Sequence, residues 1–264
     1  ELRDALHVTS GPALVKQGGL AGLLTALAPR DILFIDEVHR LSPAVEEALY
    51  PAMEDFRFDV VLGAGLGAQT MEMKLERFTL VGATTRTGLL ASPLRDRFPI
   101  QERLAYYEPA ELREIAERAA RKLGVPVERE AADELSRRAR GTPRIAIRLL
   151  QRARDFAQVE GDGDITRKIV ERTLTRLEVD AKGLDAMDRR ILAVVLDVFG
   201  GGPVGIDAVA AAVGEEGGTI EDVYEPFLIR EGYLARTPRG RVALPAAYEH
   251  LGRERPRGKQ GDLL

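Results

Sequence analysis

An apolar run that ends in two carboxylates constrains this chain more than any other feature. In DILFIDEVHRL (31–41), four apolar residues at 32–35 are followed by Asp36 and Glu37. Such a short continuous apolar run predicts a buried strand of a parallel sheet. Neighbouring strand residues point to opposite faces, so both acids serve one site only if the chain turns there. One carboxylate would then hold a magnesium ion and the other polarise a water for phosphoryl transfer; alternatively, both face solvent where the strand ends.

A second apolar run, FTLVGA (78–83), predicts another buried strand that ends just before Thr84. If this strand lies beside 32–35 in a parallel sheet, its terminal hydroxyl reaches the crevice where open α/β sheets bind ligands. The motif SPLRDRF then supplies Arg95 and Arg97. A guanidinium beside a phosphate site stabilises transition-state charge. The alternative is an exposed arginine pair that bonds the aspartate between its members.

Residues 1–105 predict an α/β domain whose parallel sheet is covered on both faces, because helical stretches separate the apolar runs. Ser42, followed by a proline, predicts the N-cap of one of these helices. Two alternating runs, 56–62 and 70–75, flank the glycine-rich stretch 63–68 and predict a projecting β-hairpin. Alternatively, the apolar residues of this hairpin pack on the domain itself.

Residues 106–182 predict a helical domain. One helix starts at Glu108, which precedes a proline, and stops at Gly124, since glycine readily adopts the left-handed conformation of a helix C-terminus. Thr142 precedes another proline and predicts the N-cap of a long amphipathic helix. A further helix is expected after Thr166.

Residues 183–250 predict a winged helix-turn-helix. Asp185, with a second aspartate three residues on, predicts a capped helix, and Thr219 predicts another N-cap. The stretch 233–244 then predicts a strand, a turn and a second strand. Three helices followed by a two-stranded wing are typical of this motif. Residues 251–264 show no apolar period and are predicted to be disordered.

Composition excludes several classes of site. The chain has 264 residues, no cysteine and three scattered histidines, which excludes disulfides and argues against thiolate or histidine metal centres. Its net charge of −4 provides no global attraction to nucleic acid, so any such surface must be local. No apolar run reaches membrane-spanning length and no signal peptide opens the chain, which predicts a cytosolic protein. The chain begins with Glu1, and we expect its natural N-terminus to lie upstream.

Charge is distributed unevenly over the predicted winged helix. Acids lie in the helix that would normally read bases, at positions Glu221, Asp222 and Glu225. They would repel phosphates, which argues against this helix lying deep in a major groove. Arginines lie on the wing instead, at Arg236, Arg239 and Arg241. They predict a clamp on phosphates that reads no bases; the alternative is that they are solvated or contact another protein.

The order of six long blocks resembles the RuvB family of bacterial AAA+ ATPases, which drive branch migration at Holliday junctions. The blocks are DILFIDEVHRLSPAVEEALYPAMEDF, FTLVGATTR, SPLRDRF, RGTPRIAIRLLQRARDFAQV, GGGPVGIDAVAAAVGEE and EPFLIREGYLARTPRGR. The resemblance implies an AAA+ large domain at 1–105, a helical lid at 106–182 and a winged helix at 183–250. It also implies ATP and Mg²⁺ as cofactors.

The resemblance assigns roles residue by residue. Asp36 would hold the magnesium ion, Glu37 would activate water, and Thr84 would sense the γ-phosphate. Arg97 would act as the finger given to the nucleotide of a neighbouring subunit, and Arg144 as a second sensor on the lid. The first turn of a capped helix suits Arg144, because its backbone N–H groups favour phosphate. Further nucleotide contacts are implied at Glu54, Asp55, Phe56 and Tyr107.

The resemblance also implies partners. The hairpin at 56–76 would dock a RuvA-type junction-binding protein, the wing would contact duplex DNA at Arg236 and Arg241, and the subunits would form a homo-oligomeric ring, a hexamer in this family. No G-x-x-x-x-G-K-[ST] loop occurs in the 264 residues, so we expect this chain alone to bind ATP poorly and to hydrolyse little. The leading interpretation is an ATP-driven DNA translocase. The alternatives are another AAA+ remodeller, such as a clamp-loader-like ATPase, and a DNA-binding adaptor that does not hydrolyse ATP.

Overall fold

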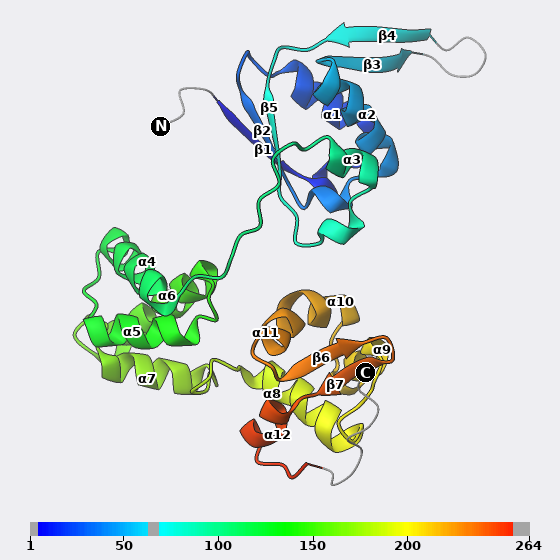
Figure 1. Ribbon diagram of the computed structural model, residues 1–264. Coiled ribbons are helices and arrows are strands. Elements are labelled where there is room, and N and C mark those ends of the chain that lie inside the picture. The colour runs from blue at the N-terminus through cyan, green and yellow to red at the C-terminus, as the bar shows by residue number, and fades with distance from the viewer. Residues whose placement is uncertain (1–4, 63–68, 256–264) are drawn as a thin grey trace. The chain divides into compact units, whose positions relative to one another are not determined.

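The computed structural model describes residues 5–62 and 69–255, which form two compact units that divide after Arg103 (Figure 1). The first unit contains a parallel sheet of strands β1 (Leu6–Ser10), β2 (Ile32–Asp36) and β5 (Thr79–Gly82), in the order β1-β2-β5. The expected pairing of the two apolar runs is confirmed, since Ile35 of β2 lies opposite Gly82 of β5. The strand β1 was not predicted, because its sequence LHVTS has only two strongly apolar residues.

One face of this sheet is buried and the other is open. Leu33 and Ile35 are fully buried, whereas Leu6, Val8 and Val81 are exposed. In the strand register these exposed residues lie beside the half-buried Ile32 and Phe34 of β2, on the face of the sheet that does not carry Leu33 and Ile35. The prediction that helices cover both faces is therefore wrong for the described residues.

Three helices accompany the sheet: α1 (Gln17–Thr25), α2 (Pro43–Glu54) and α3 (Ser92–Asp96). Their apolar residues join the strands in one core, with fully buried side chains at Leu20, Leu24, Leu33, Ile35, Leu49 and Leu94. The helix predicted from Ser42 is confirmed, and its first residue is Pro43, whose missing N–H is not needed there.

The predicted hairpin is confirmed as strands β3 (Arg57–Leu62) and β4 (Gln69–Lys74), which pair antiparallel. Its connecting residues 63–68 lie outside the described part. Phe58 is buried in the core of its own unit, whereas Met71, on the other strand, is exposed. The base of the hairpin thus packs on its domain, while part of its length keeps apolar surface exposed.

The second unit begins with four helices: α4 (Pro109–Leu123), α5 (Arg129–Arg138), α6 (Pro143–Glu160) and α7 (Arg167–Arg176). The predicted start and stop of α4 are confirmed: Glu108 forms a capping box with Glu111, and Gly124 is left-handed with φ of 67°. The core of these helices is built from small and branched residues, including Leu135, Leu150, Ala153, Ile165 and Val170.

A winged helix follows in the same unit. Its helices are α8 (Ala186–Ala193), α9 (Ile206–Val213), α10 (Gly217–Thr219), α11 (Glu225–Arg230) and α12 (Pro245–His250), and its wing is β6 (Leu234–Thr237) paired with β7 (Gly240–Ala243). The capping box of Asp185 and Asp188 is confirmed. The prediction that Thr219 is an N-cap is wrong: the helix starts at Gly217, and Thr219 has helical φ and ψ of −64° and −42°.

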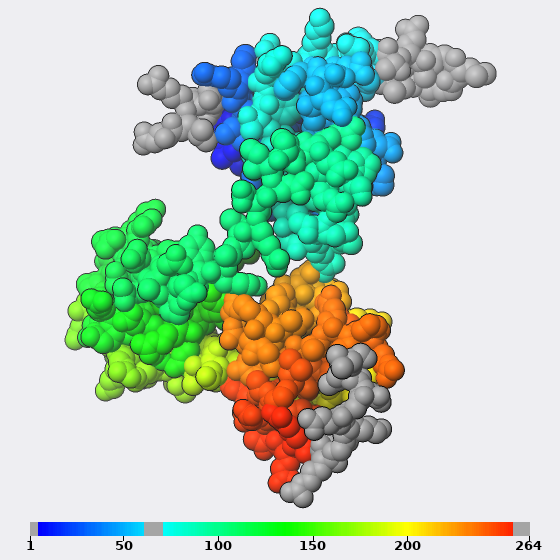
Figure 2. Space-filling view, in the orientation of Figure 1, coloured from blue at the N-terminus to red at the C-terminus, as the bar shows by residue number. Residues whose placement is uncertain are grey.

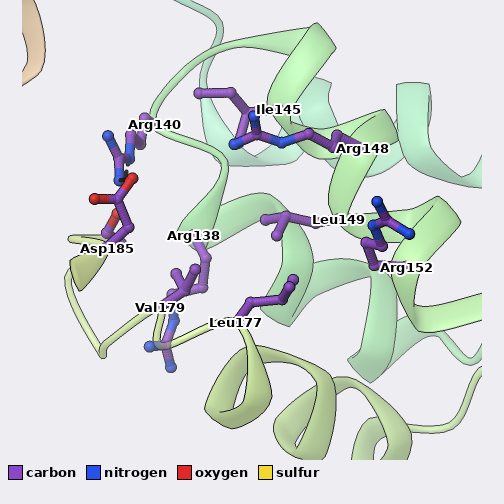
Figure 3. A pocket seen from close by; sticks show the side chains of 10 residues that line it. Arg138, Arg140, Ile145, Arg148, Leu149, Arg152, Leu177, Val179 and Asp185 are labelled. Carbon is purple, nitrogen blue, oxygen red and sulfur yellow. Dashed lines mark hydrogen bonds and ion pairs between the residues drawn. The ribbon is translucent and has the colours of Figure 1, made fainter. Parts of the chain in front are cut away.

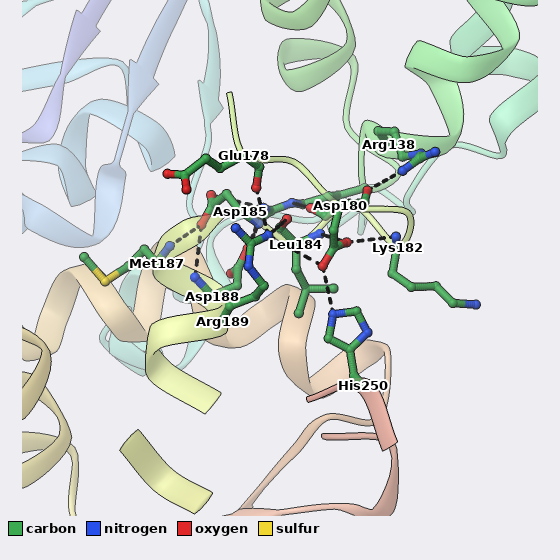
Figure 4. Close-up of polar contacts among 12 residues, drawn as sticks. Arg138, Glu178, Asp180, Lys182, Leu184, Asp185, Met187, Asp188, Arg189 and His250 are labelled. Carbon is green, nitrogen blue, oxygen red and sulfur yellow. Dashed lines mark hydrogen bonds and ion pairs between the residues drawn. The ribbon is translucent and has the colours of Figure 1, made fainter. Parts of the chain in front are cut away.

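The connection between the lid helices and the winged helix is held by Asp180 (Figure 4). Its carboxylate accepts hydrogen bonds from the backbone N–H groups of Lys182 and Leu184 and lies 2.8 Å from His250 Nε2. Burial alone would raise the pKa of Asp180, but the two N–H groups and His250 outweigh it and lower the pKa. The last turn of the winged helix is thereby tied to the linker.

Order also extends past the predicted end of this domain. Arg253, in the stretch expected to be disordered, donates from Nε to Asp197 Oδ1 at 2.8 Å. The prediction of disorder is therefore wrong at this residue, because the Asp197 pair anchors it; residues 256–264 lie outside the described part. No helix in the described ranges is both long and apolar enough to cross a membrane.

Candidate nucleotide site and DNA-binding wing

The two acids at the end of β2, Asp36 and Glu37, lie at a tight turn. Glu37 is left-handed, with φ of 48°, and the three residues that follow it form a short 3₁₀ helix. Its N–H donates to Asp36 Oδ1 at 2.9 Å. A non-glycine residue in this conformation carries strain, which persists mainly where the surroundings enforce it. Here hydrogen bonds hold the turn, since Arg40 N donates to the Glu37 carbonyl oxygen at 2.8 Å, and Gly11 packs so closely on that oxygen that an added Cβ would lie 2.4 Å from it. The backbone therefore turns at Glu37, which is the condition under which Asp36 and Glu37 can direct their carboxylates to one site.

The hydroxyl of Thr84 lies at the same edge of the sheet. Thr84 Oγ1 is 2.8 Å from Nδ1 of His39, which follows the acids on the 3₁₀ turn. The backbone joins the two strand ends as well, since Val38 N donates to Ala83 O at 2.9 Å. The structure thus brings Asp36, Glu37 and Thr84 to one edge. Sequence reasoning missed His39, because a lone histidine carries no signal for a partner 45 positions away.

Thr84 is not a free hydroxyl. Besides its contact with His39, its Oγ1 accepts a hydrogen bond from Arg86 N at 3.0 Å. Thr85, one residue further, is exposed and has no recorded side-chain hydrogen bond among the described residues. The neighbouring threonines therefore differ: one is tied to the loop after β2, and the other is available to a ligand.

The acidic edge fits the way in which proteins hold magnesium. Mg²⁺ is usually held by one or two carboxylates together with waters and substrate phosphates, rather than by a protein cage. Asp36 is exposed, so its carboxylate is accessible to a hydrated ion. Within residues 5–62 and 69–255, no group of three or more acidic or histidine side chains is arranged to enclose a metal ion. A single-carboxylate contact at Asp36 is consistent with both observations.

Arg97 forms a second cluster with α2 of its own unit. Its Nη2 lies 2.9 Å from Glu54 Oε1, its Nη1 donates to Pro93 O at 2.8 Å, and its guanidinium stacks 4.3 Å from the centroid of the Tyr50 ring. Arg97 Nε is buried without a hydrogen-bond partner in the described part. Two residues predicted to contact nucleotide, Glu54 and Arg97, therefore meet each other.

Asp55 and Phe56 do not join the acidic edge. Phe56 packs edge-to-face on Phe78 at 6.0 Å between ring centroids, with Arg77 stacked above it. Phe78 precedes β5, whereas Thr84 follows it, so Phe56 lies at the other end of this strand. The two residues instead line an open hollow of about 370 Å³ at the base of the hairpin. Within one subunit, they are separate from the Asp36 group.

Tyr107 and Arg144 flank one loop of the second unit. Tyr107 N donates to Gly141 O at 2.9 Å, and Arg144 lies in the first turn of α6, three residues after Gly141. Both side chains are exposed, and Tyr107 keeps 45% of its surface accessible. The backbone of Tyr107 is thus joined to the loop that leads into α6, where Arg144 lies in the first turn.

The same loop is joined to the winged helix through Arg140, which sequence reasoning also missed. Arg140 Nη2 lies 2.5 Å from Asp188 Oδ2 and 3.1 Å from Asp185 Oδ2, and the guanidinium stacks on Phe227 at 4.6 Å. From the other side, Arg230 Nη1 donates to Arg140 O at 3.1 Å. In the space-filling view, the segment that contains α11, in orange, lies against the lid helices, in green (Figure 2).

A hollow of about 230 Å³ lies beside this junction (Figure 3). Its apolar wall is formed by Ile145, Leu149, Leu177 and Val179. Four arginines surround it, namely Arg138, Arg140, Arg148 and Arg152. Three of them, Arg138, Arg140 and Arg152, are paired with acids, so the hollow is less positive than its composition indicates.

The wing arginines, which are predicted to clamp phosphates, are not all free of ion pairs. Arg241 donates to Glu225 Oε1 and to Glu221 Oε1, each at 2.6 Å, and its side chain is only 11% exposed. Arg236 also contacts Glu225. Two of the acids expected to repel DNA, Glu221 and Glu225, therefore face the wing and neutralise Arg236 and Arg241. Arg239, at the turn, is exposed and has no ion pair recorded among the described residues.

These features together define a AAA+ protein: a parallel α/β sheet domain with acidic and hydroxyl side chains at its carboxyl edge, a helical lid and a C-terminal winged helix. Family models match all three parts, as the Holliday junction DNA helicase RuvB P-loop domain over residues 1–104, the RuvB AAA lid domain over 107–180 and the RuvB C-terminal winged helix domain over 181–252. The chain belongs to the RuvB family.

Comparisons with individual proteins support the same family. The chain is 86% identical, over 264 residues, to the Holliday junction branch migration complex subunit RuvB of Anaeromyxobacter sp. (strain K), covering 100% of this chain and 77% of that relative. The corresponding subunit of Myxococcus xanthus is 60% identical with the same coverage. Among solved structures, the Thermotoga maritima RuvB Holliday junction branch migration motor is similar with a TM-score of 0.84 and 50% identity, over 96% of this chain and 80% of that one.

Proposed function

We propose that this protein is a subunit of an ATP-driven motor, which moves duplex DNA to drive branch migration of Holliday junctions in recombination and repair. The proposal rests on the family and on one observation, the meeting of Asp36, Glu37 and Thr84 at the carboxyl edge of the sheet. Relatives named as branch migration complex subunits support it. ATP and Mg²⁺ are the proposed cofactors, and the cytoplasm is the proposed compartment.

In the proposed reaction, Glu37 orients and polarises the attacking water, and Asp36 is the carboxylate that would hold the magnesium ion, which supplies charge neutralisation at the phosphates. Thr84 positions the acidic turn through His39 and senses the γ-phosphate of the nucleotide. The strained backbone at Glu37 supports this division of roles, because it directs the second carboxylate away from the alternation of the strand.

A second set of residues would act on the nucleotide of a neighbouring subunit. Arg97 and Glu54 form a cluster of their own, and Asp55 and Phe56 lie at the far end of β5 from Thr84. In a homo-oligomeric ring, a hexamer by family, this cluster would face the adjacent subunit. Arg97 would leave Glu54 to contact phosphate there, as an arginine finger does. Tyr107 and Arg144 would contact nucleotide from the lid.

Two surfaces would bind the macromolecular partners. The wing, with Arg236, Arg239 and Arg241, would grip duplex DNA through its phosphates. The hairpin formed by β3 and β4 would dock a RuvA-type junction-binding protein, and the exposed Met71 supports that role. A clamp-loader-like remodeller is disfavoured, because the winged helix and the hairpin both match this family.

The proposal is tested by Glu37→Gln, which keeps the shape of the side chain and removes its charge. We expect ATP turnover to fall by about 10²-fold or more, since a positioned base contributes about that much. Branch migration of a synthetic four-way junction should fall with it. Both are measured in the protein as its gene encodes it.

Glu47→Gln on α2 is the matched control, since Glu47 is exposed and its substitution changes the net charge by the same amount. Turnover that survives Glu37→Gln at the level of this control would overturn the catalytic assignment. The 264 residues tested alone provide a second reference: calorimetry should detect only weak ATP binding, because the sequence lacks a backbone cradle for the phosphates.

A further inference from the structure

Two arginines stand directly opposite each other on the wing. Arg236 of β6 pairs in register with Arg241 of β7, so their side chains share one face of a two-stranded ribbon. Like charges in this arrangement destabilise a hairpin unless a counter-charge lies between them. Two carboxylates supply it: Glu225 at the start of α11, and Glu221 in the turn before it. Two arginines and two glutamates thus form a neutral cluster.

Half of this cluster is fixed. Glu225 is 1% exposed and accepts hydrogen bonds from both arginines. Burial alone would raise the pKa of Glu225, but hydrogen bonds from Arg241 and Arg236 outweigh it and lower the pKa, so this carboxylate stays ionised. The backbone of Arg241 is held on both sides, by β6 and by Val204, which exchanges hydrogen bonds with it at 2.8 and 3.0 Å. The pair of Glu225 and Arg241 is a permanent part of the fold.

The other half is open to solvent. The side chain of Arg236 is 50% exposed and that of Glu221 is 31% exposed. Their contact is long, at 3.4 Å between Arg236 Nη2 and Glu221 Oε1. The same Oε1 accepts from Arg241 Nη2 at 2.6 Å. One carboxylate oxygen of Glu221 therefore lies between two guanidinium groups, which is the position that a phosphate oxygen would take when both arginines bind DNA.

We propose that Glu221 is an internal competitor of DNA phosphate on the wing, whereas Glu225 is the anchor that positions both arginines. DNA displaces Glu221 from Arg236 and leaves the pair of Glu225 and Arg241 intact. This inference rests on the proposed function, in which the wing grips duplex DNA. It also explains how the wing holds DNA weakly enough to move: when phosphate leaves Arg236 and Arg241, Glu221 returns between them, so neither guanidinium is left without its counter-charge.

The test is the affinity of the protein for a duplex of mixed sequence, measured by fluorescence anisotropy over a series of salt concentrations. Glu221→Gln should tighten binding by about threefold to fivefold, the range in which exposed ion pairs contribute. It should also steepen the dependence of log K on log salt by up to about one contact, because the Nη2 groups of Arg236 and Arg241 that face Glu221 become free to bind phosphate. Glu216→Gln, an exposed acid on the same domain, makes the same change in net charge and should have a much smaller effect.

The variant Arg236→Ala separates the inference from the function on which it rests. It should weaken binding evenly across sequences, and Glu221→Gln added to it should give little further gain. If Arg236→Ala weakens binding but Glu221→Gln changes it no more than Glu216→Gln does, the competition is refuted and the wing remains the grip. If Arg236→Ala leaves binding unchanged, the wing does not hold DNA and both proposals fail. Thermal unfolding of each variant verifies that it is folded.

Discussion

Asp188 shows how far a single residue can depart from its ordinary chemistry. It is fully buried at the start of α8, and burial raises the pKa of its carboxyl to about 7, with the nearby Asp185 adding to the shift and Arg140 opposing it. Its Oδ2 accepts a hydrogen bond from Asp185 N at 2.8 Å, while its Oδ1 has no partner in the described part of the chain. The carboxylate is therefore held on one side only.

This asymmetry makes the stability of the protein depend on pH. The folded pKa lies above the unfolded value of 3.8, so between about pH 4 and 7 the folded state binds a proton that the unfolded state releases. This residue therefore contributes stability that is present at low pH and lost as the pH rises through 7. Asp188→Asn should remove that loss, because the amide cannot ionise and its oxygen can still accept.

The measurement is urea unfolding at pH 5 and pH 8 for both proteins. Other acids, such as Asp180 and Glu225, have lowered pKa values and change stability in the opposite direction, but they are present in both. The difference between the two proteins isolates Asp188. An identical change between the two pH values in the wild type and the variant would contradict the raised pKa.

Among the elements, the short loop between α5 and α6 contacts several segments that are distant in the sequence. Its Gly141 accepts a hydrogen bond from the backbone of Tyr107, Arg144 lies in the helical turn that follows it, and Arg140 within it reaches the N-terminus of α8. Helix α11 joins the opposite side: Arg230 at its C-terminus binds the Arg140 carbonyl, and Glu225 at its N-terminus holds the wing. A six-residue helix therefore touches both the lid loop and the DNA-binding strands.

Arg140→Ala tests the importance of this junction. It leaves Asp188 buried without its counter-charge, so we expect a loss of about 3 kcal/mol in the free energy of unfolding. The loss should be larger at pH 8 than at pH 5, because the protonated Asp188 needs no counter-charge. Arg148→Ala is the control, since this arginine is exposed and has no ion pair recorded in the described residues. A loss at Arg140 no larger than at Arg148 would show that the junction is not held in this way.

At the scale of the whole molecule, the chain divides into two units with separate cores. The apolar cluster of the sheet and its helices lies within residues 1–103, while the clusters of the lid helices and of the winged helix lie within 104–264. The lid and the winged helix are joined by charged and polar contacts at Arg140 and Asp180 rather than by one continuous core.

Residues 104–264 should therefore fold when expressed alone. We expect them to unfold cooperatively in urea, and to bind duplex DNA with the affinity and salt dependence of the whole chain, because the wing and both of its acids lie within this part. Circular dichroism and anisotropy measure the two properties. Retained folding with lost DNA binding would mean that the first unit contributes to the DNA surface.

The order of helices and strands could be predicted from the sequence because it depends on residues that are close together along the chain. The helix start at Glu108, the capping box of Asp185, the C-terminal glycine of α4 and the apolar runs of β2 and β5 act over a few residues, and these predictions are confirmed. Thr219 shows the limit of such reasoning, since a good capping residue lies one turn inside a helix that starts at Gly217.

The partners of the charged side chains were decided by the tertiary structure alone. The sequence by itself determined that acids follow β2, that a hydroxyl follows β5 and that arginines lie on the wing. It did not determine that Thr84 meets His39, that Arg97 meets Glu54 or that Glu225 neutralises Arg241. Charged and polar groups have many possible partners at similar energy. The choice among them is made only when packing of the apolar residues brings distant segments to within hydrogen-bonding distance.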